Sequence, residues 1–130
     1  MSGSEAYQPG SSRRSAPRRV FTLDEANRTL PLVRRIVTDI VNEYRLLNQL
    51  IEQADQSPGE HGTDATERQR AARAEVQRLN ELIEELQGIG CELKDWETGL
   101  VDFRAERCGE VVYLCWRLGE DDISHWHELH

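Results

Sequence analysis

Two long stretches of the chain repeat apolar residues at intervals that alternate between four and three. In the first stretch the repeated residues are Val33, Val37, Ile40, Tyr44, Leu47, Ile51 and Ala54. In the second stretch, which follows a polar loop with proline and glycine, they are Ala72, Val76, Leu79, Ile83 and Leu86. Such spacing places every member on one face of an α-helix, as in a coiled-coil seam. We therefore predict helices over about residues 31–55 and 66–88 that fold back on each other as a long antiparallel hairpin.

The start of the first helix is less clear than its middle. Thr22 and Glu25 have the spacing of a capping box, which indicates a helical segment shortly before residue 31. Pro31 then either begins a new helix in its first turn or kinks a continuous one, and the sequence leaves both alternatives open. Additional apolar residues widen the stripe of the first helix, so we expect that helix to bury more than one partner surface. These residues are Ile36, Val41 and Leu50.

The last third of the chain has the residue types of a small β-structure. Residues 100–103 and 111–118 are rich in β-branched and aromatic side chains, which indicates two strands joined by a turn over 104–110. We interpret 91–99 as a connector and 123–130 as a short C-terminal helix. The predicted fold is therefore α+β and mostly α, with a coiled-coil-like helical hairpin, a β-hairpin and a final helix in a single domain over 21–130.

Composition and charge exclude several classes of protein. The chain has 130 residues, with 16 Lys and Arg against 24 Asp and Glu, so its acidic surface argues against nucleic acid as a partner. No apolar run approaches the roughly 20 residues of a membrane span. Residues 1–20 contain four arginines among Gly, Ser and Pro, which predicts a disordered basic tail. The three cysteines form no CxxC pair and no export signal is evident, so we expect a cytoplasmic protein with reduced thiols.

Five short motifs occur in order along the chain: FTLDEAN at 21–27, GCELKD at 90–95, GLVDF at 99–103, VYLCWR at 112–117 and WHE at 126–128. Leu30-Pro31, Gly119-Glu120 and Ile123 accompany them. Together they resemble the small prokaryotic family called domain of unknown function 2203, and the resemblance covers about residues 20–130. It implies the domain boundaries given above, and it implies no established activity, substrate or catalytic residue.

Four residues near the predicted β-hairpin are candidate ligands of a soft metal ion. Cys91, Cys115, His125 and His127 supply the thiolate and imidazole groups that zinc and iron prefer. His125 and His127 share a face if the segment is extended, whereas His127 and His130 share one if it is helical. The spacing matches no established zinc signature. The commoner role of such residues is structural, with the cysteines as small buried groups and the histidines at the surface.

Other polar and aromatic residues near the same end complete the list of candidates. Asp95 and Glu128 are possible outer partners of a metal ligand. Asp102 lies within an apolar strand, so we expect a basic partner for it, either Arg117 or Lys94. We expect Trp126 to belong to an aromatic core with Trp96 and Trp116 rather than to stack on a ligand. The sequence contains no phosphate-binding loop and no nucleophile elbow, so it assigns no catalytic residue.

Two functions from different classes follow from these patterns. The first is a non-enzymatic module that forms a homo-oligomer, or binds a partner protein, through its helices. It rests on the apolar surface that exceeds one helix–helix seam. The alternative is a metal-binding or redox protein that uses zinc or iron at the cysteines and histidines near the β-hairpin.

Overall fold

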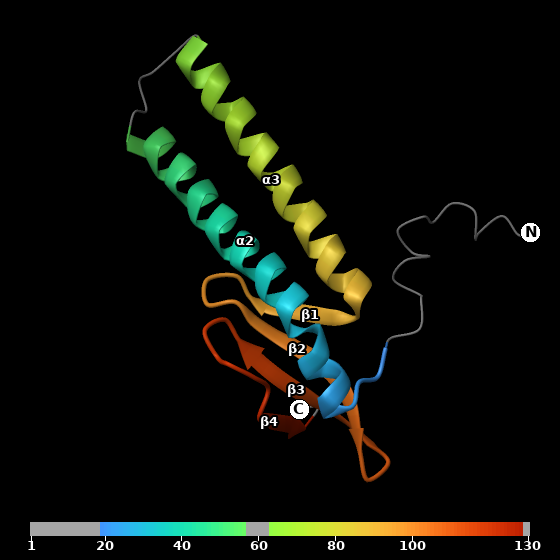
Figure 1. Cartoon of the computed structure of the whole chain (residues 1–130). Coiled ribbons are helices and arrows are strands. Elements are labelled where there is room, and N and C mark those ends of the chain that lie inside the picture. The colour runs from blue at the N-terminus through green and yellow to red at the C-terminus, as the bar shows by residue number, and fades with distance from the viewer. Residues whose placement is uncertain (1–18, 57–62, 129–130) are drawn as a thin grey trace, which may run out of the picture.

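The computed structural model describes residues 19–56 and 63–128. Along the chain come α2 (Leu23–Gln56), α3 (Thr63–Ile89), β1 (Cys91–Asp95), β2 (Leu100–Arg107), β3 (Glu110–Arg117) and β4 (His125–Glu128). Within the described residues the strands form one antiparallel sheet in the order β1-β2-β3-β4. The two helices lie side by side; the first part of α2 crosses one face of this sheet, α3 ends beside β1, and the pair projects far beyond the sheet (Figure 1). The fold is α+β and mostly helical, and the predicted tail at 1–20 lies almost entirely outside the described residues.

α2 is one continuous helix with Pro31 inside it, which decides between the two alternatives that the sequence leaves open. The predicted capping box is confirmed at its start. The Glu25 backbone N–H donates to Thr22 Oγ1 at 3.0 Å, and the Thr22 N–H donates to Glu25 Oε1 at 2.9 Å. These two bonds satisfy donors that a helix N-terminus leaves without partners. The helix therefore begins at Leu23, earlier than its heptad spacing indicates.

Two segments belong to the sheet although the sequence analysis assigned neither to a strand. β1 occupies the first part of the predicted connector, and β4 lies in the segment predicted to be a short C-terminal helix. The helix prediction for 123–130 is wrong because residues 125–128 pair with the exposed edge of β3. A two-stranded hairpin is marginally stable in water, and each outer strand satisfies backbone groups along about half of one of its edges.

The central hairpin of β2 and β3 is longer than predicted. Its strands reach Arg107 and resume at Glu110, so only Cys108 and Gly109 form the turn. Both turn residues have positive φ, 53° at Cys108 and 82° at Gly109. Positive φ at both central residues is what a two-residue type I′ turn requires, and its twist matches that of the flanking strands. The predicted turn at 104–110 is therefore too wide.

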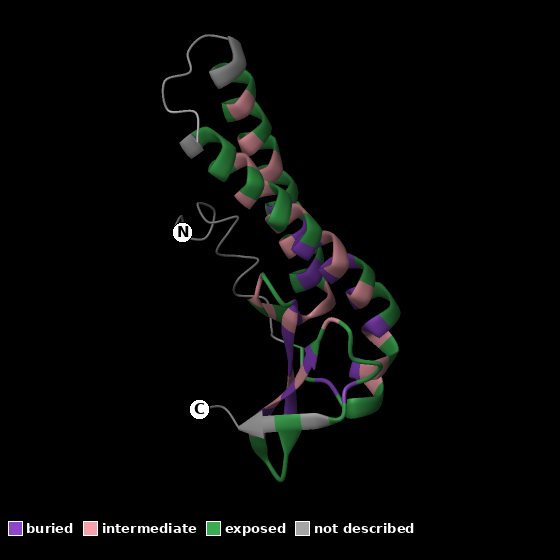
Figure 2. Ribbon diagram, turned by 90° about the vertical axis from the view of Figure 1, so that its left-hand side faces the viewer, coloured by how far each residue is buried: buried purple, intermediate pink, exposed green. Residues whose placement is uncertain are grey.

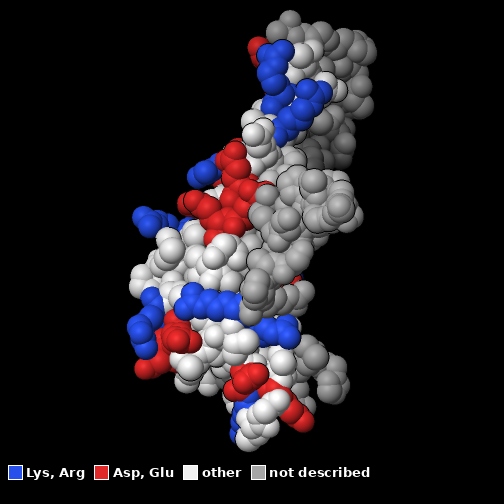
Figure 3. Space-filling view, turned by 90° about the vertical axis from the view of Figure 1, so that its right-hand side faces the viewer, with Lys and Arg blue, Asp and Glu red and all other residues white. Residues whose placement is uncertain are grey.

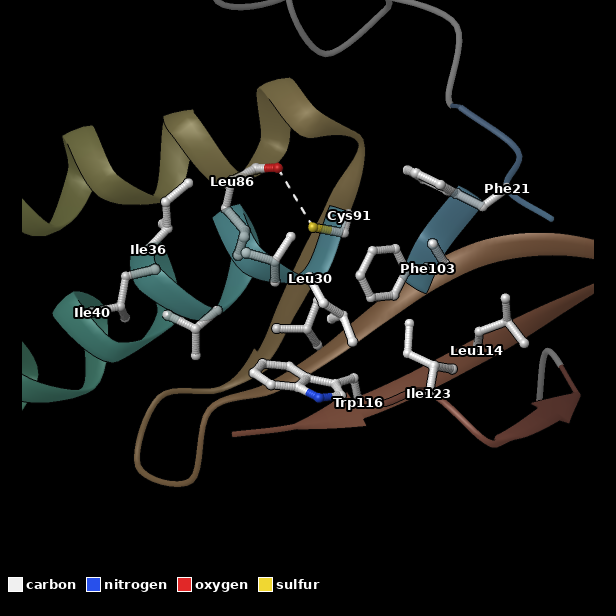
Figure 4. Packing of buried hydrophobic residues seen from close by; sticks show 14 of the residues in the cluster. Phe21, Leu30, Ile36, Ile40, Leu86, Cys91, Phe103, Leu114, Trp116 and Ile123 are labelled. Carbon is white, nitrogen blue, oxygen red and sulfur yellow. Dashed lines mark hydrogen bonds between the residues drawn. The ribbon is translucent and has the colours of Figure 1, made fainter. Parts of the chain in front are cut away.

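The core lies between α2 and the face of the sheet that the helices cover. Phe103, Leu114 and Trp116 alternate along β2 and β3 and point toward the helices, where they meet Leu30 and its neighbours (Figure 4). Phe21 contributes from the segment before α2, with its ring edge-on to Phe103 at 5.2 Å between centroids. Aromatic pairs favour this edge-to-face geometry. The core thus joins the start of α2 to the middle of the sheet.

Only part of the predicted helix–helix seam is buried. Buried positions concentrate near the sheet and become rare toward the far end of the helices (Figure 2). Ile51 and Val76 are 50% and 46% exposed, although the heptad spacing places both in the seam. In α3 the buried residues are Leu79, Leu82 and Leu86.

The seam differs from the prediction because α2 divides its wide apolar stripe between two partners. Val37 and Val41 face the turn between β1 and β2, where a Cβ added to Gly99 would lie 2.8 Å and 3.3 Å from their methyl groups. The side of α2 that contacts α3 is therefore rotated around the helix axis relative to the side that the heptad spacing predicts. As a result Glu75, rather than Val76, precedes Leu79 in the seam of α3.

Candidate functional site

The register of the sheet separates the two thiols that the sequence analysis grouped. Cys91 is paired with Phe103, on the face that the helices cover. Cys115 is paired with Asp102 on one side and with His125 on the other. Directly paired residues of antiparallel strands point to the same face, and neighbours along a strand point to opposite faces. Cys115 therefore lies on the face of the sheet that the helices do not cover, which we call the open face. The sheet separates it from Cys91.

Cys115 and Asp102 interact directly on the open face. The Cys115 Sγ donates a hydrogen bond to Asp102 Oδ1 at 3.0 Å, and Asp102 is only 6% exposed. Burial, followed by this hydrogen bond, raises the pKa of the Cys115 thiol to about 12. The thiol is therefore protonated at neutral pH, and a protonated thiol is a poor nucleophile. Lys94, one of the two predicted partners of Asp102, instead lies 3.3 Å from Glu92.

Cys91 has a structural position at the junction of α3 and β1. Its Sγ donates to the Leu86 carbonyl at 3.6 Å, as Figure 4 shows. That carbonyl belongs to the last turn of α3, where the helix offers few donors of its own. Burial raises the pKa of the Cys91 thiol to about 12. This environment is that of a small buried side chain which helps to end a helix.

Asp95 builds the turn between β1 and β2. Its carboxylate accepts the Thr98 hydroxyl at 2.8 Å and the Glu97 N–H at 3.0 Å. These two hydrogen bonds, Thr98 first, lower the pKa of the Asp95 carboxyl group. Arg117 is exposed, and its positive charge acts on both Asp95 and Cys115. Asp95 thus shapes a turn, as aspartate commonly does.

β4 carries the remaining candidates. His125 pairs with Cys115 and His127 pairs with Tyr113, so both histidines lie at positions of the open face. Trp126 points to the opposite face and is 40% exposed, with the Arg107 guanidinium 3.8 Å from its ring centroid. The prediction that Trp126 joins the core is therefore wrong, because β4 lies at the edge of the sheet. The side chains of His125, His127 and Glu128, and all of His130, lie outside the described residues.

The described side chains offer little support for a metal centre. Among them, no three of His, Cys, Asp and Glu gather as a group that could hold an ion. The structure does not bring Cys91 and Cys115 together, and each thiol donates a hydrogen bond to an oxygen of the chain. The support for a small-molecule pocket is also weak. The hollow lined by Val41, Tyr44, Arg45, Asn48 and Glu97 has a volume of about 210 Å³, below the usual size of ligand sites.

The helical pair contains a carboxyl pair that the sequence analysis missed. Glu75 of α3 forms a hydrogen bond to Glu43 of α2, and this bond is the main cause that raises the Glu75 pKa to about 7. Partial burial and the negative charge of Glu43 raise it further, whereas Arg78 lowers it. Glu75 Oε2 is buried and has no hydrogen-bond partner among the described residues. The pair went unnoticed because the heptad spacing places Val76 in the seam, one residue away.

Beyond the sheet, both helices continue the apolar stripes that face it. Tyr44 packs on Trp96, with 5.4 Å between ring centroids, and Ile51 follows seven residues later on the same side of α2. Ile83 packs against the core, and Val76 lies seven residues earlier on the same side of α3. We call Ile51 and Val76 the distal face. It is the continuation of a buried surface into a region where the described residues leave it exposed.

The fold and these sites define a small α+β protein in which a helical pair projects from a four-stranded sheet within the described residues, with the Cys91 and Cys115 thiols hydrogen-bonded inside the fold. The sequence model of the uncharacterized conserved proteins DUF2203 matches residues 19–130, and the chain belongs to that family. This confirms the resemblance found from the short motifs. No curated protein and no solved structure matches the chain. In the part of the chain that the structure describes, neither helix is apolar enough over a sufficient length to cross a membrane.

Proposed function

We propose that this protein is a non-enzymatic interaction module that binds another protein chain through the projecting half of its helical pair. The observation that carries the proposal is the exposure of Ile51 and Val76 on the distal face. Large apolar side chains that continue a buried stripe into solvent are typical of surfaces that bind a partner. Leu46, on the same half of α2, is also exposed.

The polar groups support a binding role rather than a catalytic one. Raised pKa values keep the Cys91 and Cys115 thiols protonated, and Asp95 is engaged in a turn. A catalytic acid or nucleophile needs a pKa matched to its task and access to a substrate. The free cysteines favour a reducing compartment, and we propose the cytoplasm.

Sedimentation velocity of the full chain, alone and in an extract of its source cells, tests the proposal. We expect the labelled chain to sediment in complexes larger than its own 15.0 kDa. The variant Ile51→Asp/Val76→Asp should lose these complexes, because a charge on the distal face would have to be desolvated on binding. Leu32→Asp is the matched control, since Leu32 is 43% exposed but lies on the part of α2 near the sheet.

Two results would contradict the proposal. One is a chain that sediments as 15.0 kDa under every condition. The other is a set of complexes that the distal-face variant and the control reduce equally. Circular dichroism of each variant shows whether its helices remain folded, so that a loss of binding can be separated from a loss of structure.

A metal or redox role is the alternative proposal, and the pairing of Cys115 with His125 on the open face is the observation that favours it. Imidazole and thiolate are ligands of zinc and iron. Elemental analysis of protein purified without an affinity tag tests this role. We expect about one equivalent of metal, lost in Cys115→Ala, if a site forms there. Metal below about a tenth of an equivalent would remove the alternative.

A further inference from the structure

One row of residues on the outer side of α3 has its basic and its acidic members in two separate groups. Arg70 and Arg73 lie toward the start of the helix, Glu81 and Glu84 lie toward its end, and Gln77 lies between them. Intervals of three and four place all five residues on one side of the helix, and all five are exposed. Figure 3 shows this side, with basic residues on the projecting part and acidic residues closer to the sheet. We call these five residues the charge stripe.

The charge stripe points away from α2. The seam positions Leu79, Leu82 and Leu86 are buried, and residues of the charge stripe lie about half a turn from them around the helix. A second protein can therefore approach this side along much of the length of α3 without meeting α2. Val76 lies three residues after Arg73, so the α3 part of the distal face is next to the charge stripe.

Opposite charges within the charge stripe are eight or more residues apart, too far to pair with each other along the helix. Arg70 and Arg73 are three residues apart, as are Glu81 and Glu84, and like charges at this spacing repel each other. Exposed neighbours outside the charge stripe, Glu67 three residues before Arg70 and Arg78 three residues before Glu81, offset part of this repulsion. The segregated arrangement is favourable when an oppositely patterned surface lies beside it.

A second copy of the chain has that pattern when it runs antiparallel. Arg70 and Glu84 each lie seven residues from Gln77, and Arg73 and Glu81 each lie four residues from it. A two-fold axis at Gln77 therefore places each arginine opposite a glutamate of the second copy. We propose that α3 forms a symmetric antiparallel dimer through the charge stripe. This inference goes beyond the proposed function, because the charge stripe and the distal face are different surfaces of the helical pair.

The chemistry of the charge stripe sets the strength of such a dimer. Exposed ion pairs each contribute little, so the contact should be weak and reversible. It should also weaken as salt rises, because exposed charges are screened within about 10 Å at 0.1 M salt. The two Gln77 side chains meet at the axis, where each amide can donate to the other. A symmetric contact of this kind uses the same surface on both copies.

Complementary charge reversals test the dimer with the full chain. We expect Arg70→Glu/Arg73→Glu to raise the dissociation constant at least about tenfold, because glutamates then face glutamates. Glu81→Arg/Glu84→Arg should do the same with arginines. An equimolar mixture of the two variants should associate again, since an all-acidic stripe then meets an all-basic one. Analytical ultracentrifugation in low salt measures all three samples.

The matched control is Arg35→Glu/Arg45→Glu, which changes the net charge equally at exposed residues of α2. It should associate like the unmodified chain. The inference is overturned if the unmodified chain stays monomeric in low salt, or if it dimerises and the mixture fails to restore association. Neither result removes the proposed function, which fails only if complexes are absent or insensitive to the distal face.

Discussion

The half of the helical pair that lies over the sheet and the half that projects from it differ in how completely they bury the same kind of residue. Val33, Val37 and Ile40 belong to one heptad repeat in α2 and are fully buried. Ile51 belongs to the same repeat and is half exposed. The residue types are alike, so the difference lies in what covers them. Near the sheet these side chains belong to the core that α2 shares with the strands, whereas beyond the sheet only the neighbouring helix remains.

This contrast separates stability from binding within one element. Burial of apolar area supplies most of the free energy of folding, so the sheet-backed half should hold most of it. The projecting half contributes little burial of its own and contains a carboxyl pair in its seam. The projecting half can therefore bind a partner without any change in the packing of the core. The stability of each half can be tested separately by substitution.

The largest effect is expected in the sheet-backed core at Trp116, which is fully buried beneath α2. Trp116→Ala should lower the free energy of unfolding by about 3–5 kcal/mol, because it removes a large apolar side chain and leaves a cavity. Urea denaturation followed by circular dichroism measures the loss. Leu46→Ala, at an exposed site in the projecting half, is the comparison and should cost less than about 1 kcal/mol. Equal losses would mean that the two halves do not differ as described.

The next largest effect concerns the contact that anchors α2 to the sheet. Gly99 has φ of +76°, and an added Cβ would lie 2.8 Å from Val37 and 2.9 Å from Leu118. Gly99→Ala should destabilise the chain by about 1–3 kcal/mol through overpacking and backbone strain. Gly88→Ala is the matched control in α3, where nothing lies within 4 Å of the added atom. It should leave stability unchanged or raise it slightly, and thermal unfolding distinguishes the two variants.

A smaller effect is expected from the carboxyl pair in the projecting half. The folded state raises the Glu75 pKa from 4.5 to about 7, so the folded chain binds a proton more tightly than the unfolded chain does. Stability contributed by this proton is present below pH 4.5 and is lost as pH rises toward 7. We expect a loss of about 1 kcal/mol over that window, because water screens a partly exposed pair.

Glu75→Gln should flatten this part of the pH profile, because an amide donates a hydrogen bond to Glu43 and does not ionise. Urea midpoints measured at pH 5 and pH 8 give the slope. Glu85→Gln removes a carboxylate from the exposed side of the same helix and should leave the slope of the unmodified chain. A profile that stays steep in Glu75→Gln would show that other groups cause it.

Local signals in the sequence were sufficient for much of the fold. The capping box at Thr22 and Glu25 and the strand composition of β2 and β3 are read from neighbouring residues, and the structure confirms them. β4 could not be predicted in this way, because its state depends on the free edge of β3 rather than on residues 125–128 themselves. Pro31 left two alternatives because a proline can either begin a helix or lie within one, and the structure shows that α2 continues through it.

The candidate site shows the same division. The sequence named Cys115 and Asp102, and the structure brings them into contact. It also named Cys91, which the register places on the other face. A register cannot be derived from composition, because a shift of one residue exchanges the two faces of a strand. The Glu43 and Glu75 pair was missed because a heptad pattern does not predict which apolar residues of α2 contact α3 and which contact the sheet.

The smallest expected effect is at Val76, and it tests the phase of the seam directly. Val76→Gln should change the free energy of unfolding by less than about 0.5 kcal/mol at concentrations where the chain is monomeric, because its side chain is largely in water. Leu79→Gln is the matched substitution one turn later and should cost at least about 2 kcal/mol, since it buries an amide in an apolar seam. Equal losses of unfolding free energy at the two positions would mean that Val76 lies in the seam, as the heptad spacing predicts. A small cost at Val76 together with weaker complexes would mean that this valine serves binding rather than folding.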